Sequence, residues 1–343
     1  MKPREVIKRV IDFNNPPRIG YDLKYGHYTD FRSLDMKRDK RPELEWQRPD
    51  FFAKRFPKYL EFDGFLRLDD FGNLWGKMSH DLTGGGEVME GVLQDWADLD
   101  NFKMPDWDNP DRYAHIPSES EKLSDYYQTA WIPGFPFSLM RKMRKMETFL
   151  MDLIIEKENV MKLNDMVVDM LVGMIESYGG TGVDCIFFCE DWGLQDRLLI
   201  SPELWREMFK PSFKILCDCA KKNGLKVFMH SCGYIYDILE DLIEVGIDVF
   251  QFDQPTVMGM ERVAKIFNKR ATLFAETDIQ KILPTGDREL IEDTTEKMTK
   301  LFHKNGGFIA RDYGDYRTIQ VDQEWAQWMR DKFYEIGGVP DSI

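Results

Sequence analysis

The chain has 343 residues, of which 43% are hydrophobic and 13% aromatic, and it carries a formal charge of −14 at pH 7. A chain of this length and apolar content can bury one large core or two smaller ones, which excludes an intrinsically disordered protein. The excess of acids makes nucleic acid an unsuitable partner, because binding to phosphates depends on clustered Lys and Arg. Neutral or cationic small molecules, metal ions and basic proteins remain as classes of ligand.

The sequence contains neither a membrane span nor a pattern typical of export. Its longest apolar run, residues 167–175, is interrupted by Asp169 and is far shorter than the roughly 18 residues that a span needs. Charges scattered through the N-terminal residues leave no apolar core of a signal peptide. Five cysteines, an odd number, indicate reduced thiols rather than a disulfide framework. We therefore expect a cytoplasmic protein.

Charge is distributed unevenly in the N-terminal third of the chain. Residues 24–58 contain ten Lys or Arg against six Asp or Glu, whereas residues 61–125 contain sixteen Asp or Glu against five Lys or Arg. Both segments have weak periodicity, so we expect residues 24–125 to form an irregular layer of solvated charge within one domain, residues 1–343. The alternatives are a cap over an active site and a docking face for a partner.

From about residue 130, short apolar runs alternate with amphipathic stretches, which is typical of repeated strand and helix units. The strands are expected at residues 18–22, 130–135, 183–189, 226–230, 249–252, 271–275 and 307–310. The helices are expected at residues 148–178, 202–223, 235–245, 260–268 and 288–305. Ser201 and Pro202 form a helix start, and Pro211 is expected to kink or split the helix that follows.

Repeated units of this kind predict a parallel sheet with right-handed crossovers, either open or closed into a barrel. Neither G-x-G-x-x-G between a strand and a helix nor a phosphate-binding loop motif occurs, so nucleotide binding has no support. A (β/α)8 barrel needs roughly 250 residues, which leaves about 90 for the N-terminal layer. We therefore expect an α/β fold, a TIM barrel with an irregular N-terminal elaboration.

Ionisable and polar residues follow the expected strands, at the point where each strand ends. In chain order they are Asp22; Glu190 and Asp191; residues 230–233; Asp253 and Gln254; Glu276, Thr277 and Asp278; and Arg311, Asp312 and Tyr313. Each could cap a helix, but six in succession favour one shared site at the C-terminal face of the barrel, where catalytic residues of this architecture lie.

His230 and Cys232 are two residues apart at a strand end, so their side chains leave on the same side. Imidazole and thiolate together suit a borderline-soft metal ion such as zinc. Two ligands do not make a site, and a buried Cys beside a hydrogen-bonded His is the alternative. The candidates for a third ligand are Glu190, Asp191, Glu276 and Asp278. The other four thiols are interpreted as structural.

Several motifs together resemble the uroporphyrinogen decarboxylase superfamily. They are Glu190-Asp191-Trp192-Gly193-Leu194-Gln195, Leu199-Ile200-Ser201-Pro202-Glu203-Leu204-Trp205-Arg206-Glu207, Lys210-Pro211, His230-Ser231-Cys232-Gly233 and Asp278-Ile279-Gln280, preceded by Arg4-Glu5, Pro16-Pro17-Arg18 and Asp70-Phe71-Gly72-Asn73-Leu74-Trp75. The resemblance covers nearly the whole chain and implies a (β/α)8 barrel.

The resemblance implies two kinds of chemistry. True uroporphyrinogen decarboxylases carry an N-terminal Arg-rich motif that binds propionates, and residues 18–23 of this chain lack it, so an octa-anionic tetrapyrrole would be repelled by the acids. The other branch comprises zinc-dependent methyltransferases that use a His-x-Cys pair and a later Cys. His230 and Cys232 match the pair, but no Cys occurs near Arg311. Either an acid such as Glu190 or Glu276 replaces it, or metal binding has been lost.

The resemblance therefore implies a methyltransferase that moves a methyl group between a small molecule (a methyl ether, amine or thiol) and a corrinoid protein, assisted by zinc. Zinc would be held by His230, Cys232 and an acid, Glu190 or Glu276. The expected catalytic residues are Asp191, Asp253, Asp278 and Tyr313, and the expected substrate contacts are Asp22, Trp192, Gln254 and Arg311. The alternatives are a decarboxylase or lyase in which Arg311 holds a smaller carboxylate, and a non-catalytic barrel that binds a corrinoid protein. A homodimer is left open.

Overall fold

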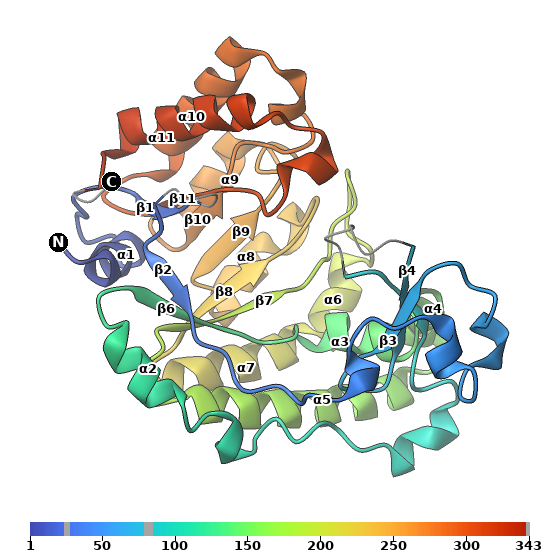
Figure 1. Ribbon diagram of the computed structural model, residues 1–343. Coiled ribbons are helices and arrows are strands. Elements are labelled where there is room, and N and C mark those ends of the chain that lie inside the picture. Colours follow the sequence, from blue (N-terminus) through green and yellow to red (C-terminus); the bar gives the residue numbers. More distant parts are fainter. Residues whose placement is uncertain (24–27, 79–84, 341–343) are drawn as a thin grey trace. The chain divides into compact units, whose positions relative to one another are not determined.

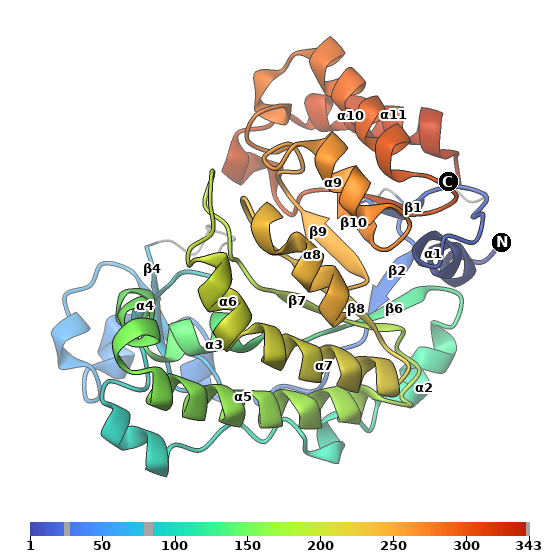
Figure 2. The same ribbon diagram turned by 180° about the vertical axis from the view of Figure 1, so that it is seen from behind.

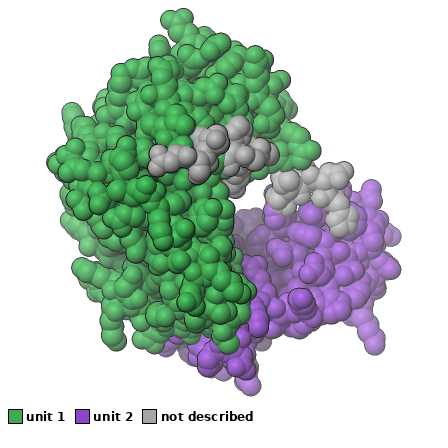
Figure 3. All heavy atoms as spheres, turned by 60° about the vertical axis from the view of Figure 1, so that its left-hand side comes forward, with its two compact units in different colours: residues 1–36, 113–133, 175–343 green, residues 37–112, 134–174 purple. Residues whose placement is uncertain are grey.

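The computed structural model describes residues 1–23, 28–78 and 85–340, and the chain divides into two compact units (Figure 3). The first unit consists of residues 1–36, 113–133 and 175–343, and the second of residues 37–112 and 134–174. Within the described ranges, every helix is too short or too polar to cross a membrane.

In the first unit, eight parallel strands form a nearly closed barrel (Figure 1). In spatial order the strands are β1 (Gly20–Asp22), β11 (Phe308–Arg311), β10 (Thr272–Ala275), β9 (Val249–Phe252), β8 (Lys226–His230), β7 (Cys185–Cys189), β6 (Tyr127–Trp131) and β2 (Phe31–Ser33). The α/β class and the TIM barrel predicted from the sequence are confirmed.

Side chains of alternate residues fill the barrel, because successive residues of a strand point to opposite faces. One buried cluster contains an inward-facing residue from nearly every strand: Phe31, Tyr127, Cys185, Phe187, Phe228, Val249, Phe274 and Ile309. Four residues of helix α1 (Pro3–Ile11), namely Val6, Ile7, Val10 and Ile11, belong to the same cluster. This helix therefore closes the N-terminal end of the barrel, and the opposite end is left for polar groups.

The other helices of the first unit lie outside the strands (Figures 1 and 2). They are α2 (Ile116–Lys122), α6 (Pro202–Met208), α7 (Lys210–Lys222), α8 (Tyr236–Val245), α9 (Met260–Phe267), α10 (Arg288–Phe302) and α11 (Gln323–Gly337). Ser201 caps α6 by accepting a hydrogen bond from the Leu204 amide. The predicted helix over residues 202–223 is split at Phe209, with Pro211 in the first turn of α7, as its proline requires.

Two expected elements differ from the structure. The strand expected at residues 130–135 is β6, Tyr127–Trp131, so the expectation began three residues late because Tyr127-Gln128-Thr129 is less apolar than the segment after it. The helix expected at residues 148–178 is two helices, α4 (Met146–Ile155) and α5 (Lys157–Tyr178). Continuous apolar periodicity concealed the break at Glu156, whose φ of −128° is outside the helical region.

The second unit contains an antiparallel sheet of β3 (Phe65–Leu68), β4 (Leu74–Lys77) and β5 (Glu87–Glu90), together with α3 (Pro136–Met143), α4 and part of α5. Its sheet packs on a cluster of Phe52, Leu66, Leu68 and Leu74. The segment expected to be an irregular layer thus supplies this sheet, and it also supplies the barrel strand β2. Strands of three or four residues leave too short a pattern for detection.

The motif that begins at Asp70 is the turn between β3 and β4. The Asp69 carboxylate accepts hydrogen bonds from the amides of Phe71 and Asn73 and from the Trp75 indole, at 2.8–3.0 Å. Gly72 takes a φ of +94°, which favours glycine. This motif therefore has a structural role in the hairpin.

The two ends of the strand order, β1 and β2, are joined through Asp30. Its buried carboxylate accepts two hydrogen bonds from Arg18, at 2.6 and 2.8 Å, and one from the Tyr21 amide, at 2.8 Å. The Asp30 amide in turn donates to the Tyr21 carbonyl. Arg18 is only 8% exposed, so this ion pair is shielded from water.

We predict that Asp30→Ala lowers the free energy of unfolding by about 3–5 kcal/mol, because it leaves the Arg18 guanidinium buried without its carboxylate. Urea unfolding followed by circular dichroism measures the change. The control is Asp218→Ala, which removes an exposed pair with Lys214 on α7 and is expected to cost about 0.5 kcal/mol or less. Equal losses in the two variants would contradict a closing role for Asp30.

Candidate metal and active site

The C-terminal ends of the barrel strands present a layer of polar side chains directly above the apolar cluster. Strand alternation continues the inward positions of Phe187, Phe228 and Phe274 to Cys189, His230 and Glu276, two residues further along each chain. Gln251, Asp253 and Arg311 follow the inward-facing Val249 and Ile309 in the same way. The polar layer is therefore a direct result of strand register.

Three potential ligand groups meet in this layer. His230 Nε2 lies 3.2 Å from Cys232 Sγ and 3.5 Å from Asp191 Oδ1, and the three ligand atoms all lie within 4.8 Å of one another. Ligands of a tetrahedral zinc ion, bound at about 2.0–2.3 Å, are about 3.3–3.5 Å apart. The donors thus fit such an ion in type, and the two separations from His230 Nε2 fit it in spacing. Asp191 keeps 36% of its side chain exposed, so the group is open to a further ligand on one side.

Backbone contacts between two loops hold Asp191 beside Cys232. The Asp191 carboxylate accepts a hydrogen bond of 3.0 Å from the Cys232 amide, and the Tyr234 amide donates to the Leu194 carbonyl at 2.7 Å. The loops approach so closely that a Cβ on Gly193 would lie 2.4 Å from the Tyr234 nitrogen. Gly233, with a φ of +72°, would have a Cβ 2.4 Å from the Leu194 carbonyl oxygen. Both glycines are needed for this geometry.

The charge state of His230 reflects its neighbours. Burial lowers the pKa of the imidazole, but hydrogen bonds to Asp191 and Cys232 raise it more, and the net pKa is well above its ordinary value. The surroundings of His230 therefore favour a positive charge at its ring, and a metal ion bound at Nε2 would replace the proton there.

A series of side-chain contacts runs from His230 across the barrel. His230 Nδ1 contacts Gln251 Oε1 in a short hydrogen bond. Gln251 Nε2 donates to Asp253 Oδ1 at 2.7 Å, and Arg311 Nη1 donates to the same oxygen at 2.7 Å. Arg311 Nη1 also lies 3.5 Å from Glu276 Oε2. Strands β8, β9, β10 and β11 are thereby connected at one level.

The two acids beside Arg311 have opposite pKa shifts. Burial raises the pKa of Glu276 well above its usual range; Arg311 opposes this shift and the Asp253 charge adds to it. Burial also works against ionisation of Asp253, but His230 and Arg311 lower its pKa overall. Glu276 is thus the protonated member of the pair and Asp253 the ionised one, a division that separates a proton donor from an acceptor.

Tyr313 follows β11 and stands at the edge of the same layer. Burial and the nearby charge of Asp253 raise the pKa of its phenol, so the group stays neutral and can donate a hydrogen bond. Its backbone amide donates to the Tyr316 hydroxyl at 3.2 Å, which fixes the turn after the strand.

Other residues proposed from the sequence lie apart from the donor group. Neither Glu190, which is fully buried, nor Glu276 belongs to the metal-binding group found among the described residues. Trp192 is fully buried and packs on Trp205 and Phe209, so its ring belongs to a helix-packing cluster rather than to an open surface.

Asp278, Gln254 and Asp22 also have structural contacts. The Asp278 carboxylate accepts hydrogen bonds from the amides of Gln280 and Lys281, at 2.9 and 2.8 Å, and from the Thr256 hydroxyl, which is the pattern of a capping residue.

Gln254 is 7% exposed, and its backbone carbonyl accepts a hydrogen bond from the Val257 amide. Asp22 accepts a hydrogen bond from the Thr29 hydroxyl at 2.9 Å. Burial lowers the pKa of Arg311, but the neighbouring acids, Asp22 among them, raise it overall.

Two residues of the polar layer escaped the sequence reasoning. Gln251 is 2% exposed and touches His230, but it lies within a strand that was interpreted as wholly apolar. Trp131 ends β6, stacks on Phe187 with ring centroids 4.3 Å apart and remains 38% exposed. Inward-facing positions recur every two residues, so counting back from Asp253 places Gln251 inside the barrel. The observed bounds of β6 place Trp131 at the C-terminal end of that strand.

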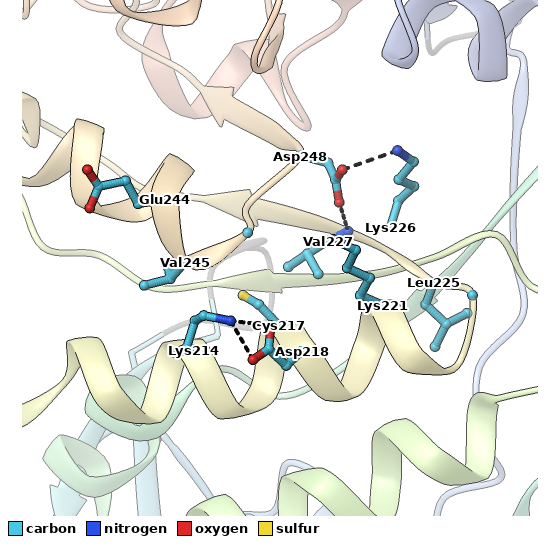
Figure 4. Close-up of a pocket in the computed structure, with 12 residues that line it drawn as sticks. Lys214, Cys217, Asp218, Lys221, Leu225, Lys226, Val227, Glu244, Val245 and Asp248 are labelled. Carbon is cyan, nitrogen blue, oxygen red and sulfur yellow. Dashed lines mark hydrogen bonds and ion pairs between the residues drawn. The ribbon is translucent and has the colours of Figure 1, made fainter.

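A cavity of about 450 Å³ lies at the opposite end of the strands, between α7, the start of β8 and the end of α8 (Figure 4). Four of its charged residues form two pairs: Lys214 with Asp218 on α7, and Lys226 with Asp248, whose carboxylate also accepts from the Val227 amide at 2.9 Å. These contacts stabilise the N-terminal face, and the chemistry is concentrated at the other end of the barrel.

Comparison with known proteins gives a family match and a similarity of fold. The family model of uroporphyrinogen decarboxylase matches residues 81–311, about two thirds of the chain. A comparison with curated protein sequences found no match.

Among solved structures, a methyltransferase from Methanosarcina mazei superposes with a TM-score of 0.66 at 14% identity, over 98% of this chain and 99% of that one. D-psicose 3-epimerase from Clostridium cellulolyticum H10 superposes with a TM-score of 0.42 at 9% identity, over 70% of this chain and 86% of that one. The first of these similarities supports the fold.

We predict that Gly193→Ala weakens zinc binding at least about tenfold, because the added Cβ forces the Asp191 loop away from the Cys232 loop and misplaces a ligand by contacts outside the donor group. Zinc affinity is measured by competition with a chelator. Gly85→Ala, at a glycine with open space around its Cβ position, is the matched control and should bind zinc like the unmodified protein. Unchanged affinity in folded Gly193→Ala would show that loop contact does not set the donor geometry.

Proposed function

The chain belongs to the uroporphyrinogen decarboxylase family, and from this premise we propose that it transfers a methyl group between a small methylated molecule and a corrinoid protein. The observation that carries the proposal is the meeting of His230, Cys232 and Asp191 at the C-terminal end of the barrel. A His-x-Cys pair is the feature by which the sequence resembles the methyltransferase branch. The fold shared with the Methanosarcina mazei methyltransferase is consistent with it.

The three donor groups suggest which residue takes the place of the later Cys that this sequence lacks. The contact of Asp191 with His230 and its hydrogen bond from the Cys232 amide support Asp191 as the third ligand, so that an acid would replace the thiolate. Zinc bound by these groups would act as a Lewis acid on the ether oxygen, amine or thiol involved in the transfer. One thiolate and one carboxylate together compensate the charge of the divalent ion.

The surrounding side chains would orient the methylated molecule. Trp131 offers an exposed aromatic face, which suits methyl groups and methylated amines. The neutral Tyr313 phenol can donate a hydrogen bond to the substrate or accept one from it. Asp253 and Arg311 compensate each other's charge, so the layer contributes little net charge beyond the donor group.

The family's other chemistry has less support. In a decarboxylase, Arg311 would hold the substrate carboxylate, but its guanidinium already contacts Asp253 and Glu276. An incoming carboxylate would have to displace a buried ion pair, which costs several kcal/mol. Residues 18–23, where the Arg-rich motif is expected, provide Arg18, and this residue is buried against Asp30.

The experiment is metal analysis combined with a methyl-transfer assay. We expect about one zinc per chain in the purified protein and methylation of cob(I)alamin by at least one methoxylated, methylamine or methylthiol compound from a panel. His230→Ala and Cys232→Ala are expected to lose both zinc and at least about 99% of the activity. The matched control is Cys219→Ala, which removes a thiol from α7 and should retain both.

Two results would contradict the proposal. Full methyl-transfer activity in zinc-free protein would show that zinc has no part in the reaction. Stoichiometric zinc with no transfer from any compound of the panel, to free cobalamin or to a corrinoid protein, would leave a metal-binding barrel of another function.

A further inference from the structure

We propose that Gln251 is a positioning residue that fixes the tautomer of His230, so that the Nε2 lone pair faces the other two metal donors. The inference rests on the proposed metal centre and concerns a side chain that does not itself touch the metal. It follows from the direction in which hydrogen bonds must run from Arg311 to His230.

The direction is set at Arg311, because a guanidinium can only donate hydrogen bonds. Its Nη1 donates to Asp253 Oδ1 at 2.7 Å, and a carboxylate held by such a partner is an acceptor. Asp253 is 13% exposed and Arg311 17%, so few waters compete for these groups. The partner of Asp253 on its other side must therefore be a donor.

Gln251 is that partner, and its amide has one donating and one accepting end. The NH₂ group donates to Asp253 Oδ1 at 2.7 Å, which leaves the carbonyl oxygen to face His230 Nδ1. The opposite orientation would place the amide oxygen against a carboxylate, with two acceptors in contact and no proton between them. Gln251 is only 2% exposed, so water cannot relieve that contact.

The same rule then fixes His230. A carbonyl oxygen only accepts, so Nδ1 must carry the proton in its hydrogen bond with Gln251. When a metal ion takes the place of the second ring proton, the imidazole is neutral and keeps one N–H, so its lone pair is on Nε2, the atom 3.2 Å from Cys232 Sγ and 3.5 Å from Asp191 Oδ1. A metal ligand needs that lone pair, and the hydrogen bond to the other ring nitrogen holds the ring in place.

Strand register makes the series possible. Gln251 and Asp253 occupy successive inward positions at the end of β9, and His230 is the residue of β8 paired with Gln251. The ring and the amide are therefore neighbours on adjacent strands, and the next inward residue places the carboxylate within reach of the same amide.

The test compares zinc affinities by chelator competition. Gln251→Leu removes the acceptor for the Nδ1 proton, and Asp253→Asn allows the asparagine NH₂ to donate to Gln251, so that the amide can reverse and present NH₂ to His230. Each variant is expected to bind zinc about 10–100-fold more weakly than the unmodified protein. Gln128→Leu, at a fully buried glutamine of β6 that bonds the Ser120 carbonyl, is the matched control and should keep the original affinity.

A double variant shows whether zinc affinity depends on the direction of these hydrogen bonds or on the packing of the side chains. In Gln251→Glu/Asp253→Asn, the asparagine NH₂ donates to a carboxylate at position 251, and that carboxylate accepts the Nδ1 proton, with the total charge unchanged. We expect its zinc affinity to return to within about threefold of the original, and we expect nitrogen NMR of zinc-free protein with a neutral ring to show the His230 proton on Nδ1 in it but not in Asp253→Asn.

Original affinity in both single variants would overturn the inference, as would a double variant no better than the single ones. Zinc-bound protein that transfers no methyl group would contradict the proposed function while the affinity series still supports the role of Gln251. Weak binding in the single variants with recovery in the double variant is the supporting result.

Discussion

The two-residue alternation of side chains along parallel strands is the constraint on which the rest of the structure depends. Inside the barrel, this alternation directs Phe187, Phe228 and Phe274 into an apolar core, which α1 closes at the N-terminal end. At the C-terminal ends of the strands, the same alternation directs His230 and Glu276, two residues further along, into a polar layer. A strand shifted by one residue would exchange its inward and outward faces and lose both the core and the site.

Within that layer, the chemistry depends on groups that face one another at low exposure. The donor atoms of Asp191, His230 and Cys232 meet because two glycine-containing loops pack backbone to backbone. Arg311 compensates the acids at the centre of the barrel, and burial keeps Glu276 protonated. The site thus combines a small group of donors suited to a cation with surrounding side chains that neutralise one another, an arrangement that suits a neutral or cationic ligand better than a polyanion.

Sequence patterns predicted the barrel and most of its strands because β8 and β9 are short apolar runs that end in polar residues. They also singled out His230 and Cys232 as candidate ligands, from their spacing together with the acids at the other strand ends, with Asp191 among four candidates for the third ligand. Sequence patterns could not show which of the four acids is the third ligand, because this depends on a contact between two loops. The loops meet at Gly193 and Tyr234, which are far apart in the sequence. Gln251 was missed because a glutamine inside an apolar run looks like any partly buried strand residue.

The measurement that tests the central claim most directly is zinc K-edge X-ray absorption of the zinc-loaded protein. The account predicts one sulfur ligand at about 2.3 Å, from Cys232, with nitrogen and oxygen ligands at about 2.0–2.1 Å, from His230, Asp191 and an exchangeable group. A zinc ion with no sulfur ligand, or with two, would contradict a site formed by these three residues.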